Sequence, residues 1–134
     1  MQEGQALPEL RKSVSQDQIN RYAQVSGDSN PIHLDAEAAA SSTFGSIVAH
    51  GMLVLAFVSE MMAQAFGKSW LESGRLKARF SAPAYPGDEV TTFGSIVKLQ
   101  PEGKGWRVQC LVGCRRVGGQ EVVTGEASVL VAGR

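Results

Sequence analysis

Residues 47–66 read Ile-Val-Ala-His-Gly-Met-Leu-Val-Leu-Ala-Phe-Val-Ser-Glu-Met-Met-Ala-Gln-Ala-Phe, and a helix drawn from them is apolar on nearly every side. His50, Glu60 and Gln64 interrupt the run, so it suits a buried helix better than a membrane span. Gly67 follows at the position of a C-cap. We therefore expect the rest of the chain to supply a surface that wraps this helix.

The residues after this helix predict antiparallel sheet. Leu76, Ala78 and Phe80 alternate with polar residues, as in a strand with one buried face. Longer strands follow at residues 90–99, 106–117 and 121–131, joined by the glycine-rich links 101–105 and 118–120 as hairpins. With a further short strand over residues 4–14, the pattern predicts an α+β fold whose sheet curls round the central helix.

Local signals place helices and a loop before the central helix. Ser15-Gln16-Asp17-Gln18 fits the capping box, in which Ser15 caps a helix and the Gln18 side chain reaches back. We expect this helix to end at Ser26-Gly27. Residues 26–34 are rich in turn formers and predict a loop, after which Asp35 can cap a short helix through Ala40.

The composition indicates one domain, residues 1–134, without a strong electrostatic field. The 13 Lys and Arg residues balance 13 Asp and Glu residues, so we expect neither nucleic acid nor an anionic membrane as a partner. The first residues carry no signal-peptide pattern. Cys110 and Cys114 share one face of a predicted strand, too far apart for an easy disulfide, and predict free thiols in a reducing cytoplasm.

Residues able to carry chemistry gather around positions 28–33 and 50–51. Asp28 and His33 flank a turn-rich run that can point a carboxylate and an imidazole into one cleft. A water held between them would meet two groups that can take and return a proton. Gly51 lies in the first turn of the central helix, where unpaired N–H groups favour a developing negative charge and the missing Cβ admits a ligand.

Structural roles compete with each of these interpretations. Asp28 can bond its own turn, His33 can be satisfied by backbone groups, and Asn30 can brace the loop. His50 is interpreted as structural, packing or orienting the turn. Ser59, two turns into the helix, can contact a substrate or bond a carbonyl of its own helix. From the residues alone, hydrolysis, hydration and metal binding all remain open.

The run Tyr22-x-x-Val25-Ser26-Gly27-Asp28-x-Asn30-Pro31-Ile32-His33 resembles the hydratase-2 motif of the MaoC-like (R)-specific enoyl-CoA hydratases, without a departure. The similarity continues through Val48-Ala49-His50-Gly51-Met52, Arg79-Phe80-x-x-Pro83 and Pro86-Gly87-Asp88-x-Val90. It covers nearly the whole chain, whose length is similar to that of the short members with a single hot-dog domain.

This resemblance implies a hot-dog fold, usually a homodimer, and reversible hydration of trans-2-enoyl-CoA to (R)-3-hydroxyacyl-CoA. It makes Asp28 and His33 the catalytic pair and gives the thioester oxygen to the Gly51 N–H. It places Ser59 near the reacting centre and lets Asn30 support the loop. It implies no metal or other cofactor, because the coenzyme A thioester, or its acyl-carrier-protein counterpart, is the substrate.

Several alternatives share the fold but differ in chemistry. An acyl-carrier-protein dehydratase would run the same step backwards. A hot-dog thioesterase would direct water at C1 rather than C3, and an acyl-thioester-binding subunit would leave the chemistry to a partner. A metal held by Asp28, His33, Asp35 and His50 is the weakest alternative, because their spacing matches no common ligand pattern.

Overall fold

The computed structural model describes residues 1–133, whose strands form an antiparallel sheet in the order β1-β3-β4-β5-β2. The strands are β1 (Arg11–Ser13), β2 (Arg75–Phe80), β3 (Glu89–Glu102), β4 (Gly105–Arg116) and β5 (Glu121–Ala132). The predicted hairpin links join β3 to β4 and β4 to β5, so that Glu102 pairs with Gly105 and Arg115 with Glu121. The prediction of antiparallel neighbours is confirmed.

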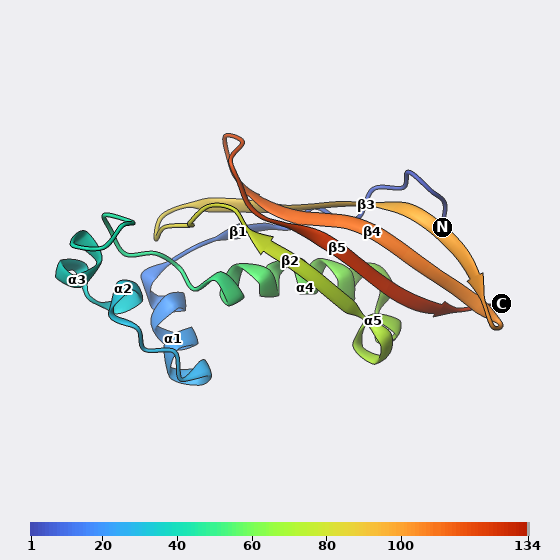
Figure 1. Ribbon diagram of the computed structural model, residues 1–134, viewed down its shortest axis with the longest axis horizontal. Helices are drawn as coiled ribbons and strands as arrows, with labels where there is room; N and C mark the ends of the chain where they lie inside the picture. Colours follow the sequence, from blue (N-terminus) through green and yellow to red (C-terminus); the bar gives the residue numbers. More distant parts are fainter. Residues whose placement is uncertain (134) are drawn as a thin grey trace.

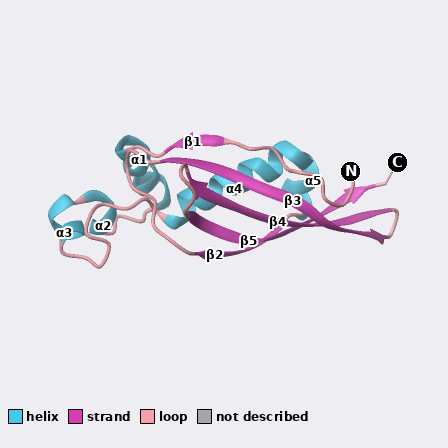
Figure 2. Ribbon diagram, turned by 90° about the horizontal axis from the view of Figure 1, so that it is seen from above, coloured by secondary structure: helices cyan, strands magenta, loops and turns pink. Residues whose placement is uncertain are grey.

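The helices are α1 (Gln16–Ser26), α2 (Pro31–Leu34), α3 (Ala36–Ala40), α4 (Gly51–Phe66) and α5 (Lys68–Ser73). In Figure 1, α4 runs along one face of the sheet, α1, α2 and α3 gather beyond one end, and α5 lies at the other. Figure 2 shows both chain termini at the α5 end. The segment with residues 28–33 therefore lies far from both termini. A sheet curled over one long helix is the hot-dog arrangement that was expected.

Alternation along β4 builds the wall that faces α4. Val108, Cys110, Val112 and Cys114 point inward and are buried, whereas Leu111 between them is 50% exposed. Burying one side chain of this size stabilises a fold by roughly 1.5–3 kcal/mol. The opposite side of the core comes from α4, through Leu53, Val54, Phe57, Val58, Met61 and Met62.

The sheet covers α4 on one side only. Met52 is 58% exposed, and Ala56, Glu60 and Gln64 follow it at helical spacing on the same open side. The expectation that this helix is wrapped all round is therefore met on the sheet side alone. No helix within residues 1–133 combines the length and the apolar character that a membrane span requires.

Three element boundaries differ from the prediction: β3 runs to Glu102 instead of ending at residue 99, and the starts of the central helix and of the first strand are also displaced. The central helix begins at Gly51 instead of residue 47, because His50 is extended and the Ala49 N–H donates to the Ala84 carbonyl at 2.8 Å. The strand expected over residues 4–14 shrinks to β1. Pro8 lacks an N–H for the ladder and separates β1 from an isolated bridge between Ala6 and Ser95.

Helix α5 corrects the expectation that only sheet follows the central helix. Gly67 (φ 55°) ends α4 as predicted, with its N–H donating to the Ala63 carbonyl at 2.7 Å. The chain then turns directly into α5, so Lys68 begins a new helix instead of closing α4. Trp70, only 7% exposed, anchors this short helix to the core. Six residues are too few for a clear apolar period, which explains why the sequence did not reveal α5.

Helix α1 confirms one half of the predicted capping box. The Ser15 hydroxyl accepts a hydrogen bond from the Gln18 N–H at 3.1 Å. The reciprocal bond is not formed, because the Gln18 side-chain oxygen is buried without a partner among the described residues. At the other end, Gly27 (φ 81°) caps α1 in the left-handed conformation that glycine adopts most easily. Asp35 caps α3 as predicted, accepting from the Glu37 and Ala38 N–H groups.

Candidate active site

Asp28 follows the C-cap of α1 and is held by its own turn. Its N–H donates to the Ser26 hydroxyl at 3.1 Å, and its carboxylate accepts from the Asn30 N–H at 3.3 Å. The side chain is still 54% exposed, and its second carboxylate oxygen faces His33. Asp28 therefore bonds its own turn, as one interpretation of the sequence predicted. This bond orients the carboxylate and leaves its second oxygen free of that turn.

His33 lies in a helical turn where a loop was expected. Asn30 caps α2 by accepting from the Ile32 N–H at 3.2 Å, and Pro31 occupies the first helical turn, where its missing N–H costs nothing. This turn buries the His33 side chain, which is 9% exposed. Asn30 thus supports the loop as predicted, through the backbone of α2 rather than through Asp28 or His33 directly.

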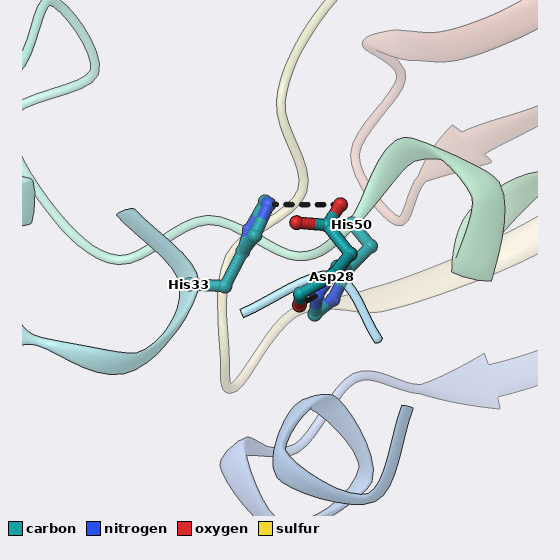
Figure 3. Close-up of side chains that lie close together, drawn as sticks. All are labelled: Asp28, His33 and His50. Atoms are coloured by element: carbon teal, nitrogen blue, oxygen red, sulfur yellow. Dashed lines mark hydrogen bonds and ion pairs between the residues drawn. The ribbon is translucent and has the colours of Figure 1, made fainter. Parts of the chain in front are cut away.

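The backbone fixes the tautomer of His33. Nδ1 lies 2.7 Å from the Val48 carbonyl oxygen, which can only accept, so Nδ1 carries the proton. The neutral ring therefore keeps an unprotonated Nε2. That atom lies 4.0 Å from the Asp28 carboxylate, and Figure 3 shows the two groups facing each other. The sequence prediction that the bend brings these side chains together is met.

A separation of 4.0 Å is too long for a direct hydrogen bond and short enough to share a water. A water about 2.8 Å from both atoms would donate one proton to each acceptor at an angle of about 90°. In their ordinary charge states, a carboxylate and a neutral imidazole both accept. The pair can therefore hold a water and draw its protons away from the oxygen.

His50 joins this pair, which the sequence did not reveal. Its Nε2 lies 2.9 Å from the Asp28 backbone carbonyl oxygen, and its ring stacks on that of His33 with centroids 3.8 Å apart and planes 25° from parallel. The ring is 3% exposed and lies edge-on to Tyr22. The predicted role in orienting the turn agrees with the hydrogen bond to Asp28. The stacking crosses 17 positions of the chain, and no local signal announces it.

A pocket of about 410 Å³ connects His33 to the start of α4. Its wall is mostly apolar and is lined by Ile32, Phe44, Val48, Ala49, Val54, Phe80 and Val122 besides His33 and Gly51. Apolar walls of this kind suit an acyl group, with few polar groups to fix its orientation. Asp28 is not part of the lining and approaches His33 from the solvent side.

Gly51 is the first residue of α4 and lies in the wall of this pocket. A first-turn N–H has no intrahelical partner, and the His50 side chain makes no capping bond here. A Cβ on Gly51 would lie 2.9 Å from the Phe80 ring, so glycine keeps the space between α4 and β2 open. The predicted setting of Gly51, an open helix start beside the acid–base pair, is present.

Ser59 lies away from this group. Its hydroxyl oxygen accepts a hydrogen bond from the Trp70 indole N–H at 3.0 Å, which ties α4 to α5. The predicted bond from Ser59 to a carbonyl of its own helix is not formed among residues 1–133. Ser59 does not line the pocket that contains His33 and Gly51. A substrate role for Ser59 stays a prediction.

Asp28, His33 and His50 offer ligand atoms within 4.8 Å of one another, a spacing that a metal ion could bridge if the rings were suitably oriented. Asp35 is not in the group, because its carboxylate caps α3. Imidazole lone pairs lie in the ring plane, and two nearly parallel rings cannot both face one ion at about 2.0–2.1 Å. One ring would have to turn, so the arrangement suits a shared water better than a metal.

A curved sheet over one long helix, with a carboxylate and an imidazole facing each other beside the helix start, defines a hot-dog protein with an enzyme-like site. The chain belongs to the MaoC-like family, because the family model described as "MaoC like domain" matches residues 2–110. The fold, family and hydro-lyase class predicted from the sequence agree with this match and with the relatives below.

The chain is similar to two kinds of curated relatives. It is 32% identical to an (R)-specific enoyl-CoA hydratase of Rhodospirillum rubrum, over 100% of this chain and 90% of the relative. It is also 32% identical to a mitochondrial 3-hydroxyacyl-[acyl-carrier-protein] dehydratase of Arabidopsis thaliana, over 96% of this chain and 76% of that protein.

Solved structures of hydratases have the same fold. An R-hydratase from Pseudomonas aeruginosa in its unliganded form superimposes with a TM-score of 0.85 at 30% identity, covering 100% of this chain and 84% of that one. An (R)-hydratase from A. caviae gives a TM-score of 0.83 at 28% identity, covering 98% and 97% of the two chains.

Proposed function

We propose that this protein catalyses the (R)-specific, reversible hydration of trans-2-enoyl-CoA to (R)-3-hydroxyacyl-CoA. The single observation that carries the proposal is the placement of Asp28 and His33. Their acceptor atoms lie 4.0 Å apart at the edge of an apolar pocket that also contains Gly51. The names of the relatives, hydratases and dehydratases of acyl thioesters, support the same reaction.

The chemistry divides between the acid–base pair and the helix start. Asp28 and His33 hold a water, and one of them takes its proton as the oxygen bonds to C3. The electron pair of the C2–C3 double bond moves toward the thioester carbonyl, whose oxygen gains charge beside the Gly51 N–H and the positive end of α4. The resulting enolate collapses as C2 takes a proton from the pair, so the atoms of one water are added.

The alternative is a dehydratase that runs this step in reverse on a substrate carried by acyl carrier protein. The dehydratase names among the relatives favour it, and the site would serve both directions equally. In either case the pair needs no redox cofactor, and we propose that no metal takes part. The coenzyme A or carrier arm remains attached to the acyl group throughout.

The direct test follows the loss of crotonyl-CoA absorbance by the purified chain and the configuration of the product. We expect (R)-3-hydroxybutyryl-CoA and unchanged turnover in the presence of a chelator. Free thiol release would instead indicate a thioesterase, and complete inhibition by the chelator would indicate that a metal takes part in the reaction. Absence of turnover with enoyl-CoA esters, but not with enoyl-carrier substrates, would favour the dehydratase.

We also propose that the protein works in a reducing cytoplasm, which suits its two free cysteines. We further propose that two copies of the chain pair through β2. Among residues 1–133, β2 pairs with β5 on one side and with no strand on the other, so its outer edge has unpaired N–H and C=O groups. Apolar side chains are exposed nearby, with Leu71 at 79% and Phe80 at 50%. Light scattering should give twice the chain mass of 14.3 kDa, and a monomer at micromolar concentration would contradict the pairing.

A further inference from the structure

We infer that His50 is a positioning residue of the proposed active site. Its contacts set the separation of Asp28 and His33, and its own ring is held in the tautomer opposite to that of His33. The inference rests on the proposed function, which assigns the Asp28–His33 pair and leaves His50 without a part. Its evidence comes from three contacts of one buried ring.

The first contact holds Asp28 from behind. Figure 3 shows the Asp28 carboxylate directed to His33 and its backbone carbonyl directed to His50. The His50 Nε2 donates to that carbonyl at 2.9 Å. Residues 26–30 are otherwise exposed, and the other hydrogen bonds of Asp28 itself go only to its neighbours Ser26 and Asn30 among residues 1–133. His50 therefore ties this exposed turn to the start of α4.

The second and third contacts fix the His50 ring itself. One face stacks on His33 at 3.8 Å between centroids, and Tyr22 of α1 approaches at 4.8 Å with its plane 74° away. The same ring thus touches both members of the pair, Asp28 through an edge and His33 through a face. A shift of His50 would change the 4.0 Å gap in which the water is proposed to lie.

The hydrogen bonds also define the proton positions. His50 donates through Nε2, so its Nδ1 carries no proton; that atom is buried and has no partner within residues 1–133. A second proton on His50 would create a buried N–H without an acceptor, which is unfavourable. A proton on His33 Nε2 would instead face the Asp28 carboxylate. The His33 Nε2 therefore faces a carboxylate, whereas the His50 Nδ1 faces no hydrogen-bond partner within residues 1–133.

Nitrogen-15 spectroscopy tests this arrangement without relying on activity. The chain has two histidines, and both lie in the site, so long-range proton–nitrogen spectra of the untagged protein contain only these two rings. We expect His33 protonated at Nδ1 alone and His50 at Nε2 alone. The inference would be overturned if both rings were in the same tautomer, or if His50 exchanged rapidly between its two tautomers.

Two substitutions separate the hydrogen bond from the ring. His50→Gln keeps an amide that can donate to the Asp28 carbonyl and removes the ring, whereas His50→Phe keeps a ring that can stack and removes the donor. Because a misplacement of about 1 Å can cost about 100-fold in rate, we expect His50→Phe to lower kcat by about 100-fold with KM within about threefold. The kcat of His50→Gln should be at least about tenfold higher than that of His50→Phe.

The possible outcomes keep the inference and the proposed function apart. Unchanged kcat in folded His50→Phe, or equal losses in both variants, would overturn the positioning role while wild-type hydration still stands. If the wild-type protein hydrates no enoyl thioester, the proposed function fails, and the tautomer spectra still decide the arrangement of His50. Thermal unfolding of both variants identifies any loss of fold, and if His50→Phe does not fold, the spectra and His50→Gln decide.

Discussion

Ser59 offers a test between a structural and a substrate-binding role for a single hydroxyl. Ser59→Ala would leave the buried Trp70 N–H without its acceptor, at a cost of roughly 1–3 kcal/mol. We expect a lower free energy of unfolding in urea and kcat/KM within about threefold of wild type for the folded protein. Ser46→Ala, at an exposed serine, is the control. Normal stability with a large loss of kcat/KM would restore Ser59 to the substrate site.

Gly51 is the residue at which added volume should affect chemistry more than stability. A methyl group there would meet the Phe80 ring at 2.9 Å and narrow the space beside the Gly51 N–H. We expect Gly51→Ala to lower kcat/KM by about 10- to 100-fold, while its unfolding free energy changes by less than about 1 kcal/mol. A second substitution, Phe80→Leu, should recover part of the loss. Full activity in Gly51→Ala would remove this N–H from the mechanism.

At the scale of elements, the start of α1 has one capping bond that is formed, to the Ser15 hydroxyl, and one that is not, from the Gln18 side chain. Ser15→Ala removes the acceptor for the Gln18 N–H and should cost about 1 kcal/mol. Gln18→Ala removes a side-chain oxygen that has no partner within residues 1–133, so it should cost less than Ser15→Ala. Urea denaturation of the two variants provides the comparison. A larger loss in Gln18→Ala would mean that the reciprocal cap forms in solution.

Elements whose signals are local could be predicted from the sequence. The Ser15 and Asp35 caps, the end of α4 at Gly67 and the two long hairpins each depend on residues within a few positions of one another. The start of α4 could not be predicted, because residues 47–49 are apolar like the helix and a long-range bond from the Ala49 N–H to the Ala84 carbonyl keeps them out of it. Helix α5 depends on Trp70 packing into the core, which no local pattern encodes.

For the whole molecule, the shared core controls the reactivity of Cys110 and Cys114. Burial raises the pKa of Cys110 to about 11 and that of Cys114 to about 12. Unfolded thiols ionise near pH 8.5, so the folded state keeps protons that the unfolded state loses. Stability should therefore fall as the pH rises from about 8.5 toward 11 and 12, and be unaffected by these groups below that range.

Labelling with a chromogenic disulfide reagent at pH 8 checks this prediction. Neither thiol should react in the native protein within minutes, and both should react in urea, because the thiolate is the nucleophile. A Cys110→Ala/Cys114→Ala variant, which lacks both groups, should lose less stability between pH 8 and pH 10. Rapid labelling of the native chain would show that the core is open at this sheet.

The site as a whole was only partly predictable. Asp28 and His33 lie five positions apart, so their pairing follows from one local bend. The contacts that hold them come from farther away: the Val48 carbonyl fixes the His33 tautomer, and His50 bonds to Asp28 across 22 positions. These long-range contacts need the tertiary fold, which places the start of α4 against α1 and α2. Sequence patterns indicate the proposed reacting groups but not the scaffold that orients them.

The most direct measurement of the central claim is the turnover of crotonyl-CoA by Asp28→Asn and His33→Ala, compared with Asp35→Asn. The control makes the same chemical change at an exposed carboxylate, and asparagine caps a helix as well as aspartate does. Loss of the basic carboxylate or of the imidazole should lower kcat by at least about 1000-fold, with thermal unfolding near that of wild type and Asp35→Asn fully active. Unchanged kcat in both folded variants would contradict a water held between these two side chains.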